Sequence, residues 1–195
     1  MSRSKTKPYP QKHESDCGPA SLKTAFAILG RRISYDTLNA ACGVTKNGTP
    51  VKKLIKVANQ FGAHVLTVEW ATLRHIQSAL KSAPQKPRVI IVDYLYSDQT
   101  PVEETGHYAV VSAYSARNGR IQLLDSYSET KKTYSWKEFL DQWYDYDYKR
   151  IKISKRGSKF RLSRKWHNRL MLVLSLDKKY LPKFSTPLTK FYPAK

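Results

Sequence analysis

Apolar residues recur at helical spacing through the N-terminal third of the chain. Between Cys17 and Gly30 they stand at i, i+3, i+4 and i+7, as Leu22, Ala25, Phe26 and Leu29. This spacing predicts a helix that is buried on one face, and Gly30 is suited to end it. Two more helices are expected at 34–42, which stops at Gly43, and at 49–62, which Thr49-Pro50 opens. The N-terminal half is therefore predicted to be mostly helical.

The pattern changes to strands in the middle of the chain. Alternating or β-branched apolar runs predict strands at 64–69, 88–94, 107–114 and 120–125, and a helix at 71–82 separates the first two strands. The step Asn118-Gly119 favours an antiparallel hairpin between the last two strands. A polar, acidic loop at 97–106 and an amphipathic helix at 135–143 complete this region.

The last quarter of the chain is less regular. Two strands are expected at 150–154 and 169–175, with a basic loop between them. Segment 177–195 has three prolines and no sustained period, which is typical of a tail or a wrapping arm. The length favours one domain, placed at 1–176 with its core at 8–145, and the basic proline-containing segment follows as a C-terminal tail.

The charge of the chain is concentrated near its C-terminus. The 35 Lys and Arg residues exceed the 15 Asp and Glu residues by 20, and segment 149–195 holds 15 of the basic residues but only one acidic residue, Asp177. Its densest part interleaves cations with Phe160 and Trp166, as surfaces that bind nucleic acid do, and the candidate polyanion-binding residues are Lys155, Arg156, Lys159, Arg161, Arg164 and Lys165. A solvated face that aids solubility explains the same charge, and no groove-reading motif accompanies it.

Targeting and metal-binding signals are weak. The first residues are polar and basic, and the longest later apolar run, at 170–174, is far too short to cross a bilayer. Two cysteines are fewer than a secreted disulfide scaffold uses, so we expect a soluble protein of a reducing compartment, the cytoplasm or the inside of a virus particle. No metal site is expected, because metal-ligand spacing is missing around His13, His64, His75 and His167.

Cys17 is placed where a thiol can react. Asp16 precedes it as a candidate N-cap and Pro19 fits only a first turn, so Cys17 lies at the helix N-terminus, where the helix dipole favours a thiolate. Gly18 allows a substrate backbone to approach closely. Cys42 instead lies in a helix beside alanines, which is typical of a small buried residue.

His107 and Asp125 are candidates for the partners of this thiol. His107 follows Gly106 at the start of one hairpin strand, and Asp125 ends the other, so the hairpin brings the two side chains toward each other. Each has an ordinary explanation, a histidine satisfied at a strand end and a capping carboxylate. Asp141, on the helix that follows, is a weaker candidate for the third position. Gln11, six residues before Cys17, is placed to donate to an oxyanion together with the Cys17 backbone N–H.

These residues resemble a known family, the papain-like double-glycine leader peptidases. The resemblance rests on Q-K-H-E-S-D-C-G-P-A-S-L at 11–22, G-H-Y-A-V-V-S-A-Y at 106–114 and I-Q-L-L-D-S-Y at 121–127. It implies an α+β papain-like fold, a helical N-terminal half packed on an antiparallel sheet, and a cysteine peptidase that cleaves peptides through an acyl-thioenzyme without a metal or cofactor. By this likeness Cys17 is the nucleophile, His107 the base and acid, Asp125 the orienting residue and Gln11 the oxyanion donor, while Gly18 and Gly106 contact substrate.

Other functions remain open at this point. Members of the family are commonly fused to membrane-spanning and ATP-binding export domains, which this sequence lacks, so a free-standing peptidase or amidase is expected. An acyl transferase would use the same intermediate. The alternative from another class is a catalytically idle papain-like protein that docks on nucleic acid or a particle through its basic C-terminal region. A weaker possibility is that this region blocks the cleft until it is displaced.

Overall fold

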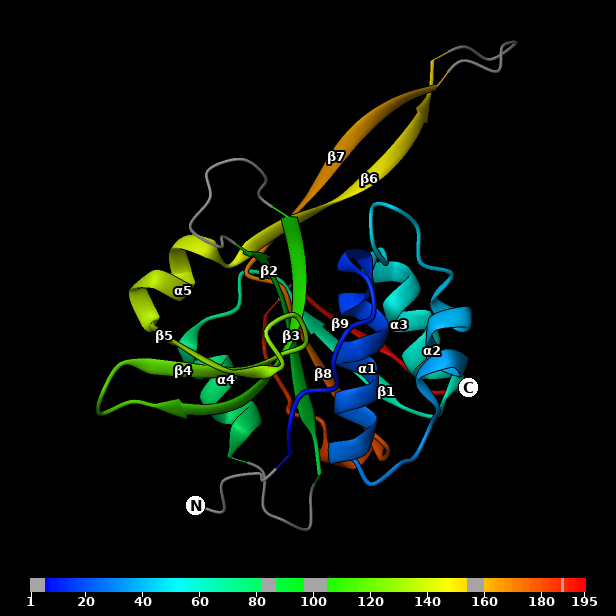
Figure 1. The fold of residues 1–195 in the computed structure, drawn as a ribbon. Helices are drawn as coiled ribbons and strands as arrows, with labels where there is room; N and C mark the ends of the chain where they lie inside the picture. The colour runs from blue at the N-terminus through cyan, green and yellow to red at the C-terminus, as the bar shows by residue number, and fades with distance from the viewer. Residues whose placement is uncertain (1–5, 82–86, 97–104, 154–159, 187) are drawn as a thin grey trace.

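A seven-stranded antiparallel sheet with helices on both faces forms the body of the protein (Figure 1). The structure is a computed structural model and describes residues 6–81, 87–96, 105–153, 160–186 and 188–195. The strand order is β5-β4-β3-β2-β8-β1-β9, and a separate two-stranded ribbon, β6 and β7, projects from this body. Helices and antiparallel strands were expected, and both are confirmed.

The helical N-terminal part follows the sequence pattern closely. It comprises a 3-10 turn, Glu14–Asp16, and three helices, α1 (Cys17–Ile28), α2 (Tyr35–Cys42) and α3 (Val51–Gln60). Helix α2 begins at Ser34, whose side chain accepts a hydrogen bond from the Thr37 N–H, and ends at Gly43 in a left-handed conformation. Asp16 occupies the N-cap position of α1, but its side chain does not cap the helix; it accepts a hydrogen bond of 2.7 Å from the Tyr35 hydroxyl instead.

The sheet contains five strands that were expected and two that were not. The expected strands are β1 (His64–Val68), β2 (Val89–Tyr96), β3 (Thr105–Ser115) and β4 (Arg120–Asp125), and the fifth, β8 (Met171–Ser175), matches the last predicted strand. The additional strands are β5 (Thr130–Ser135), which extends the hairpin, and β9 (Thr189–Tyr192), which pairs with β1. Both lie at sheet edges: β5 is mostly polar and β9 is only four residues long with no buried residue, so neither has the apolar signal of a buried strand.

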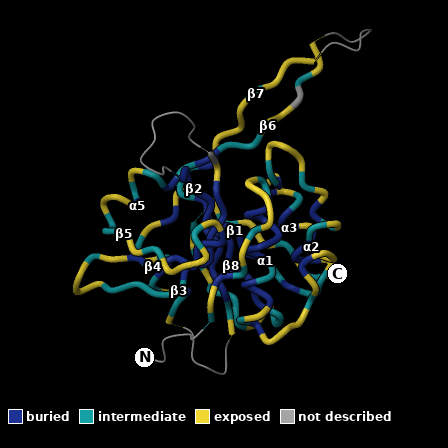
Figure 2. Tube along the Cα trace, viewed as in Figure 1, coloured by how far each residue is buried: buried dark blue, intermediate teal, exposed yellow. Residues whose placement is uncertain are grey.

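Alternate residues of the central strands face two separate hydrophobic clusters. Val89 and Ile91 pack with α1, α2 and α3, whereas Ile90 and Val92 pack with α4 (Leu73–Leu80) and α5 (Trp136–Gln142) on the other face. Figure 2 shows the buried central strands between these layers. The sheet is thus covered on both faces, which explains why its central strands are almost continuously apolar. None of the helices in the described parts of the chain has the length and apolar character needed to span a membrane.

The ribbon corrects the prediction for the basic segment. Strands β6 (Tyr144–Lys152) and β7 (Phe160–Asn168) pair in antiparallel register over their whole length. The predicted strand at 150–154 covers only the far end of β6, and the predicted loop contains β7. Phe160, Leu162 and Trp166 alternate with polar residues in β7, but all three are exposed and lie among cations, so the segment has the composition of a basic loop.

The C-terminal segment runs along the edge of the sheet. After a 3-10 turn, Lys178–Tyr180, it forms β9, and the backbone N–H groups of Ala194 and Lys195 then bond to His64 Nδ1 and the Asn59 carbonyl. It therefore wraps around the body rather than forming a wholly irregular tail. The division of the chain at residue 176 stays a prediction.

Candidate active site

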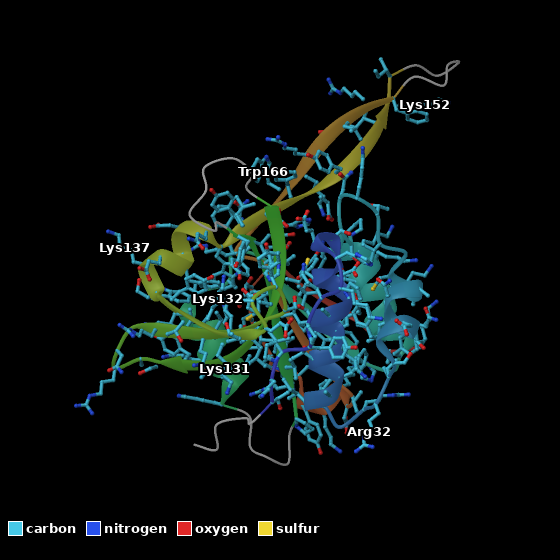
Figure 3. All side chains as sticks on the ribbon, viewed as in Figure 1. Arg32, Lys131, Lys132, Lys137, Lys152 and Trp166 are labelled. Carbon is cyan, nitrogen blue, oxygen red and sulfur yellow. The ribbon has the colours of Figure 1, made fainter. Side chains whose placement is uncertain are left out.

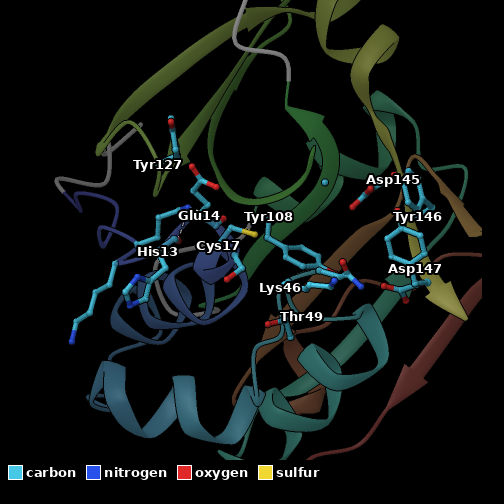
Figure 4. A pocket seen from close by; sticks show the side chains of 17 residues that line it. His13, Glu14, Cys17, Lys46, Thr49, Tyr108, Tyr127, Asp145, Tyr146 and Asp147 are labelled. Atoms are coloured by element: carbon cyan, nitrogen blue, oxygen red, sulfur yellow. Dashed lines mark hydrogen bonds between the residues drawn. The ribbon is translucent and has the colours of Figure 1, made fainter. Parts of the chain in front are cut away.

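Cys17 lies at the first position of α1 and lines a large cleft. Its side chain is 4% exposed, and the cleft has a volume of about 1090 Å³. Figure 4 shows the Cys17 sulfur pointing into this cleft. The cleft walls are formed by the loop 11–15, Cys17, the loop 46–49, Gly106, Tyr108 and the start of β6 at 145–148. The position at the helix N-terminus, expected from Pro19, is confirmed.

His107 and Asp125 meet between neighbouring strands of the sheet. The register pairs Val110 of β3 with Leu124 of β4, so Asp125 lies diagonally across from His107. His107 Nε2 is 3.4 Å from Asp125 Oδ1, close enough for an ion pair but without the geometry of a full hydrogen bond. Because Nε2 faces the carboxylate, Nδ1 is the nitrogen on the other side of the ring. Both side chains are almost wholly buried.

The environment favours a charged pair. Burial opposes protonation of His107, but its interactions with Asp125 and Cys17 outweigh this effect and raise the pKa of His107 to about 9. Burial likewise acts to raise the pKa of Asp125, yet the interaction with His107 lowers it below the usual value overall. At neutral pH the site therefore holds an Asp125 carboxylate beside a His107 imidazolium.

Asp125 is held by groups that sequence reasoning missed. Its Oδ1 accepts hydrogen bonds from the backbone N–H groups of Tyr127 (2.8 Å) and Ser128 (3.1 Å), and Lys132 Nζ lies 3.6 Å from Oδ2. Lys132 also bonds to the Tyr96 hydroxyl. Because Lys132 belongs to β5, which the sequence pattern did not reveal, no signal pointed to its position. Asp141 lies exposed on α5, and Asp125 is the carboxylate that the structure places beside His107.

Gln11 is tied into the same region. Its backbone N–H donates to the Ser126 carbonyl, and its side-chain oxygen accepts from the Ser126 hydroxyl at 2.9 Å. The amide nitrogen donates to the carbonyls of His13 and Glu14, both at 3.0 Å. Gln11 thus lines the cleft with both amide hydrogens engaged, and one of these bonds must open before Gln11 donates to a substrate.

The two glycines have different surroundings. Gly106 lines the cleft, and a Cβ added to it would lie 2.0 Å from Asp145 Oδ2, so only glycine fits there. Gly18 is buried against Thr49, whose side chain would be 2.9 Å from an added Cβ. Packing therefore explains Gly18, and its contact with substrate stays a prediction.

The second cysteine is a core residue. Cys42 is wholly buried, and burial raises the pKa of its thiol to about 12. The prediction of a small buried residue is confirmed.

Of the six predicted polyanion-binding residues, the structure describes three. Arg161, Arg164 and Lys165 are exposed on β7. Lys155, Arg156 and Lys159 lie outside the described residues.

A helix N-terminal cysteine facing a histidine and an aspartate on an antiparallel sheet defines the class of papain-like cysteine peptidases. The model of the Peptidase C39 family matches residues 5–147, about three quarters of the chain. The chain belongs to this family and is a cysteine peptidase, as the sequence motifs predicted.

Solved structures agree in fold. The peptidase domain of Streptococcus ComA, a bifunctional ABC transporter of a quorum-sensing pathway, superimposes with a TM-score of 0.61 at 19% identity, covering 87% of this chain and 98% of that chain. The peptidase domain of Streptococcus mutans ComA gives 0.54 at 18% identity, with coverages of 87% and 98%. A double-glycine motif protease from an AMS/PCAT transporter, in complex with its leader peptide, gives 0.55 at 14% identity, with coverages of 86% and 90%. Among the curated proteins there is no match. The papain-like fold class is confirmed.

Proposed function

We propose that this peptidase cleaves a polypeptide through an acyl-thioenzyme formed on Cys17. The observation that carries the proposal is the arrangement of the cleft: Cys17 lines it, and the buried His107 interacts with Cys17 on one side and with Asp125 on the other. A nucleophile, a base and a group that orients the base are the parts that this chemistry needs.

The proposed reaction has two stages. The Cys17 thiolate attacks the carbonyl carbon of the scissile bond, and His107 gives its proton to the departing amine nitrogen as the C–N bond breaks. A water then attacks the thioester carbonyl and passes a proton to His107, and the Cys17 sulfur leaves. Asp125 does not change protonation; it fixes the ring so that the same histidine acts as acid and then as base.

In both stages a negative charge develops on the carbonyl oxygen of the substrate, and hydrogen-bond donors are needed to stabilise it. The Cys17 backbone N–H at the start of α1 and the Gln11 amide are the proposed pair. Gln11 supplies its donor when a substrate oxygen replaces the carbonyl of His13 or Glu14 as its partner. Such bonds often form only in the complex with substrate.

The proposed substrate is an extended segment of a polypeptide. The cleft is open and has room for several residues, and the similar AMS/PCAT protease was solved with a leader peptide bound. The test is cleavage of a mixed-sequence peptide library, read by mass spectrometry, before and after alkylation of Cys17. We expect discrete cleavage products that alkylation eliminates. If the untreated protein yields no products, the proposal fails.

We propose as a second function that the ribbon binds single-stranded nucleic acid. The register of β6 and β7 places four exposed apolar side chains on one face, namely Tyr148, Phe160, Leu162 and Trp166. The Arg164 guanidinium lies on the same face, 4.7 Å from the centre of the Tyr146 ring. Figure 3 shows Trp166 near the base of the ribbon and Lys152 near its far end. Aromatic rings beside cations favour stacked bases and their phosphates.

Two neighbouring cations of β7 allow the proposed nucleic-acid-binding face to be compared with the opposite face of the ribbon. Arg164 and Lys165 are adjacent but lie on opposite faces. We expect Trp166→Ala and Arg164→Gln to weaken binding of a labelled single-stranded oligonucleotide roughly tenfold, and Lys165→Gln to weaken it less, as measured by fluorescence anisotropy. Equal losses for Arg164→Gln and Lys165→Gln, or tighter binding of heparin than of the oligonucleotide, would show charge attraction without a nucleic-acid surface.

A further inference from the structure

Two buried carboxyl groups outside the catalytic set meet at the wall of the cleft. Asp93 lies on β2 and is 1% exposed, and neither of its carboxyl oxygens has a hydrogen-bond donor among the described N–H and O–H groups. Asp145, at the start of β6, lines the cleft and is 9% exposed. Figure 4 shows the Asp145 carboxyl turned toward the interior of the cleft, across from Cys17.

The Asp145 carboxyl group lies against Gly106, the residue that precedes the catalytic histidine. Its Oδ2 approaches the backbone of Gly106 so closely that a Cβ there would be 2.0 Å away. Gly106 immediately precedes His107 on β3. The carboxyl therefore borders the part of the cleft in which the scissile bond would lie, and the glycine provides the space for it.

The two carboxyl groups differ in how strongly their surroundings oppose a negative charge. Burial, followed by the charge of Asp145, raises the pKa of Asp93 well above its usual value, so Asp93 is neutral and bonds to Asp145. Burial also raises the pKa of Asp145, while hydrogen bonds from Asp93 and from the Tyr146 N–H oppose that rise. The larger rise belongs to Asp93, so a negative charge on the pair is more stable on Asp145, the member that faces the cleft.

Two other charged residues of the cleft, Asp147 and Lys12, are paired within the protein, whereas Asp145 is not. Asp147 Oδ2 lies 3.2 Å from His167 Nε2, and Asp147 Oδ1 accepts the Val51 N–H at 3.2 Å. Lys12, on the other wall, pairs with Asp36 at 2.9 Å. In the described parts of the chain, no lysine, arginine or histidine nitrogen lies within 4.0 Å of the Asp145 carboxylate. A buried charge without a cation costs free energy that a cationic ligand recovers.

We propose that Asp145 is a specificity residue that binds a lysine or arginine side chain of the substrate close to the scissile bond, and that Asp93 positions it. This inference rests on the proposed cleavage of polypeptides. The bond from Asp93 fixes the Asp145 carboxylate without neutralising it, and an ammonium or guanidinium group then completes a charge-assisted pair. A neutral side chain of the same length cannot replace the cation, because it leaves the carboxylate desolvated and unpaired.

The test uses pairs of N-terminally acetylated peptides that are identical except at one position, which holds lysine in one peptide and norleucine in the other. A series of such pairs places this position at each site along the peptide in turn. At one position we expect wild type to favour lysine in kcat/KM roughly tenfold or more. Asp145→Asn should bring the ratio of kcat/KM between the lysine and norleucine peptides to about one, mainly through loss of turnover of the lysine peptide. Asp93→Asn, which keeps a donor to Asp145, should retain the preference. Asp141→Asn, an exposed carboxylate on α5, is the matched control and should also retain it.

Two results would overturn the inference: no position with a lysine preference in wild type, or equal losses for both peptides in Asp145→Asn. Binding of the same peptides to the Cys17→Ala protein, measured by calorimetry, gives the lysine preference independently of turnover. A preference in binding without any turnover would contradict the proposed cleavage but support the cationic subsite. Turnover without a lysine preference would support the proposed cleavage but contradict the cationic subsite.

Discussion

Replacing Cys17 with alanine should lower peptide turnover by at least about 10³-fold. In the proposed mechanism the Cys17 sulfur forms the covalent intermediate, and the next residues of α1, Gly18, Pro19 and Ala20, have no nucleophilic side chain. The matched control is Cys42→Ala, because Cys42 is buried in the helical layer. This control should retain turnover unless the small cavity lowers the amount of folded protein, which circular dichroism would reveal.

Reaction with iodoacetamide gives a second measure of the same residue. Cys17 lines the cleft, whereas burial holds the Cys42 thiol at a pKa of about 12 and keeps it from solvent. Peptide mapping after brief alkylation should therefore find the label on Cys17. Preferential labelling of Cys42, or full turnover by Cys17→Ala, would contradict the assignment of the nucleophile.

Asp125→Asn is expected to have the next largest effect, a fall in kcat of about 10² to 10⁴-fold. Asparagine keeps the shape of the side chain but removes the charge that supports protonation of His107. Its surroundings raise the pKa of His107 to about 9, so the imidazolium persists until the pH rises through that value. Removing the carboxylate lowers the pKa of His107, and the alkaline limb of the pH–rate profile should move to lower pH.

Asp141→Asn is the matched control for this variant. Asp141 was the alternative third member in the sequence, and it carries the same charge on the surface of α5. It should leave both kcat and the alkaline limb unchanged. If the two asparagine variants have the same profile, Asp125 does not orient His107.

The arrangement around Cys17 was predictable because its signals are local. Pro19 fixes the helix start, and Asn118-Gly119 fixes the hairpin that carries His107 and Asp125. Each signal depends on a few adjacent residues and on one preferred backbone geometry. The local sequence already favours the helix and the hairpin, and the tertiary contacts of the folded protein agree with this local preference.

The parts that the sequence did not reveal depend on distant contacts. Strand β5, with Lys132, and strand β7, with Arg164, are rich in charged residues and have no buried face, so burial does not mark them in the sequence and their pairing partners define them. The pair of Asp93 and Asp145 joins residues 52 positions apart, and no local pattern marks two carboxyl groups that meet in the folded protein. The close approach of Asp145 to Gly106 also gives that glycine a role in packing that the motif alone did not suggest.

The most direct test of the account is the intact mass of the protein during turnover of an activated peptide ester, quenched in acid within milliseconds. The account predicts an added mass equal to the acyl part of the ester, located on Cys17 by fragmentation and absent from Cys17→Ala. An ester that is consumed with no acyl adduct on Cys17, or with the adduct on another residue, would contradict it.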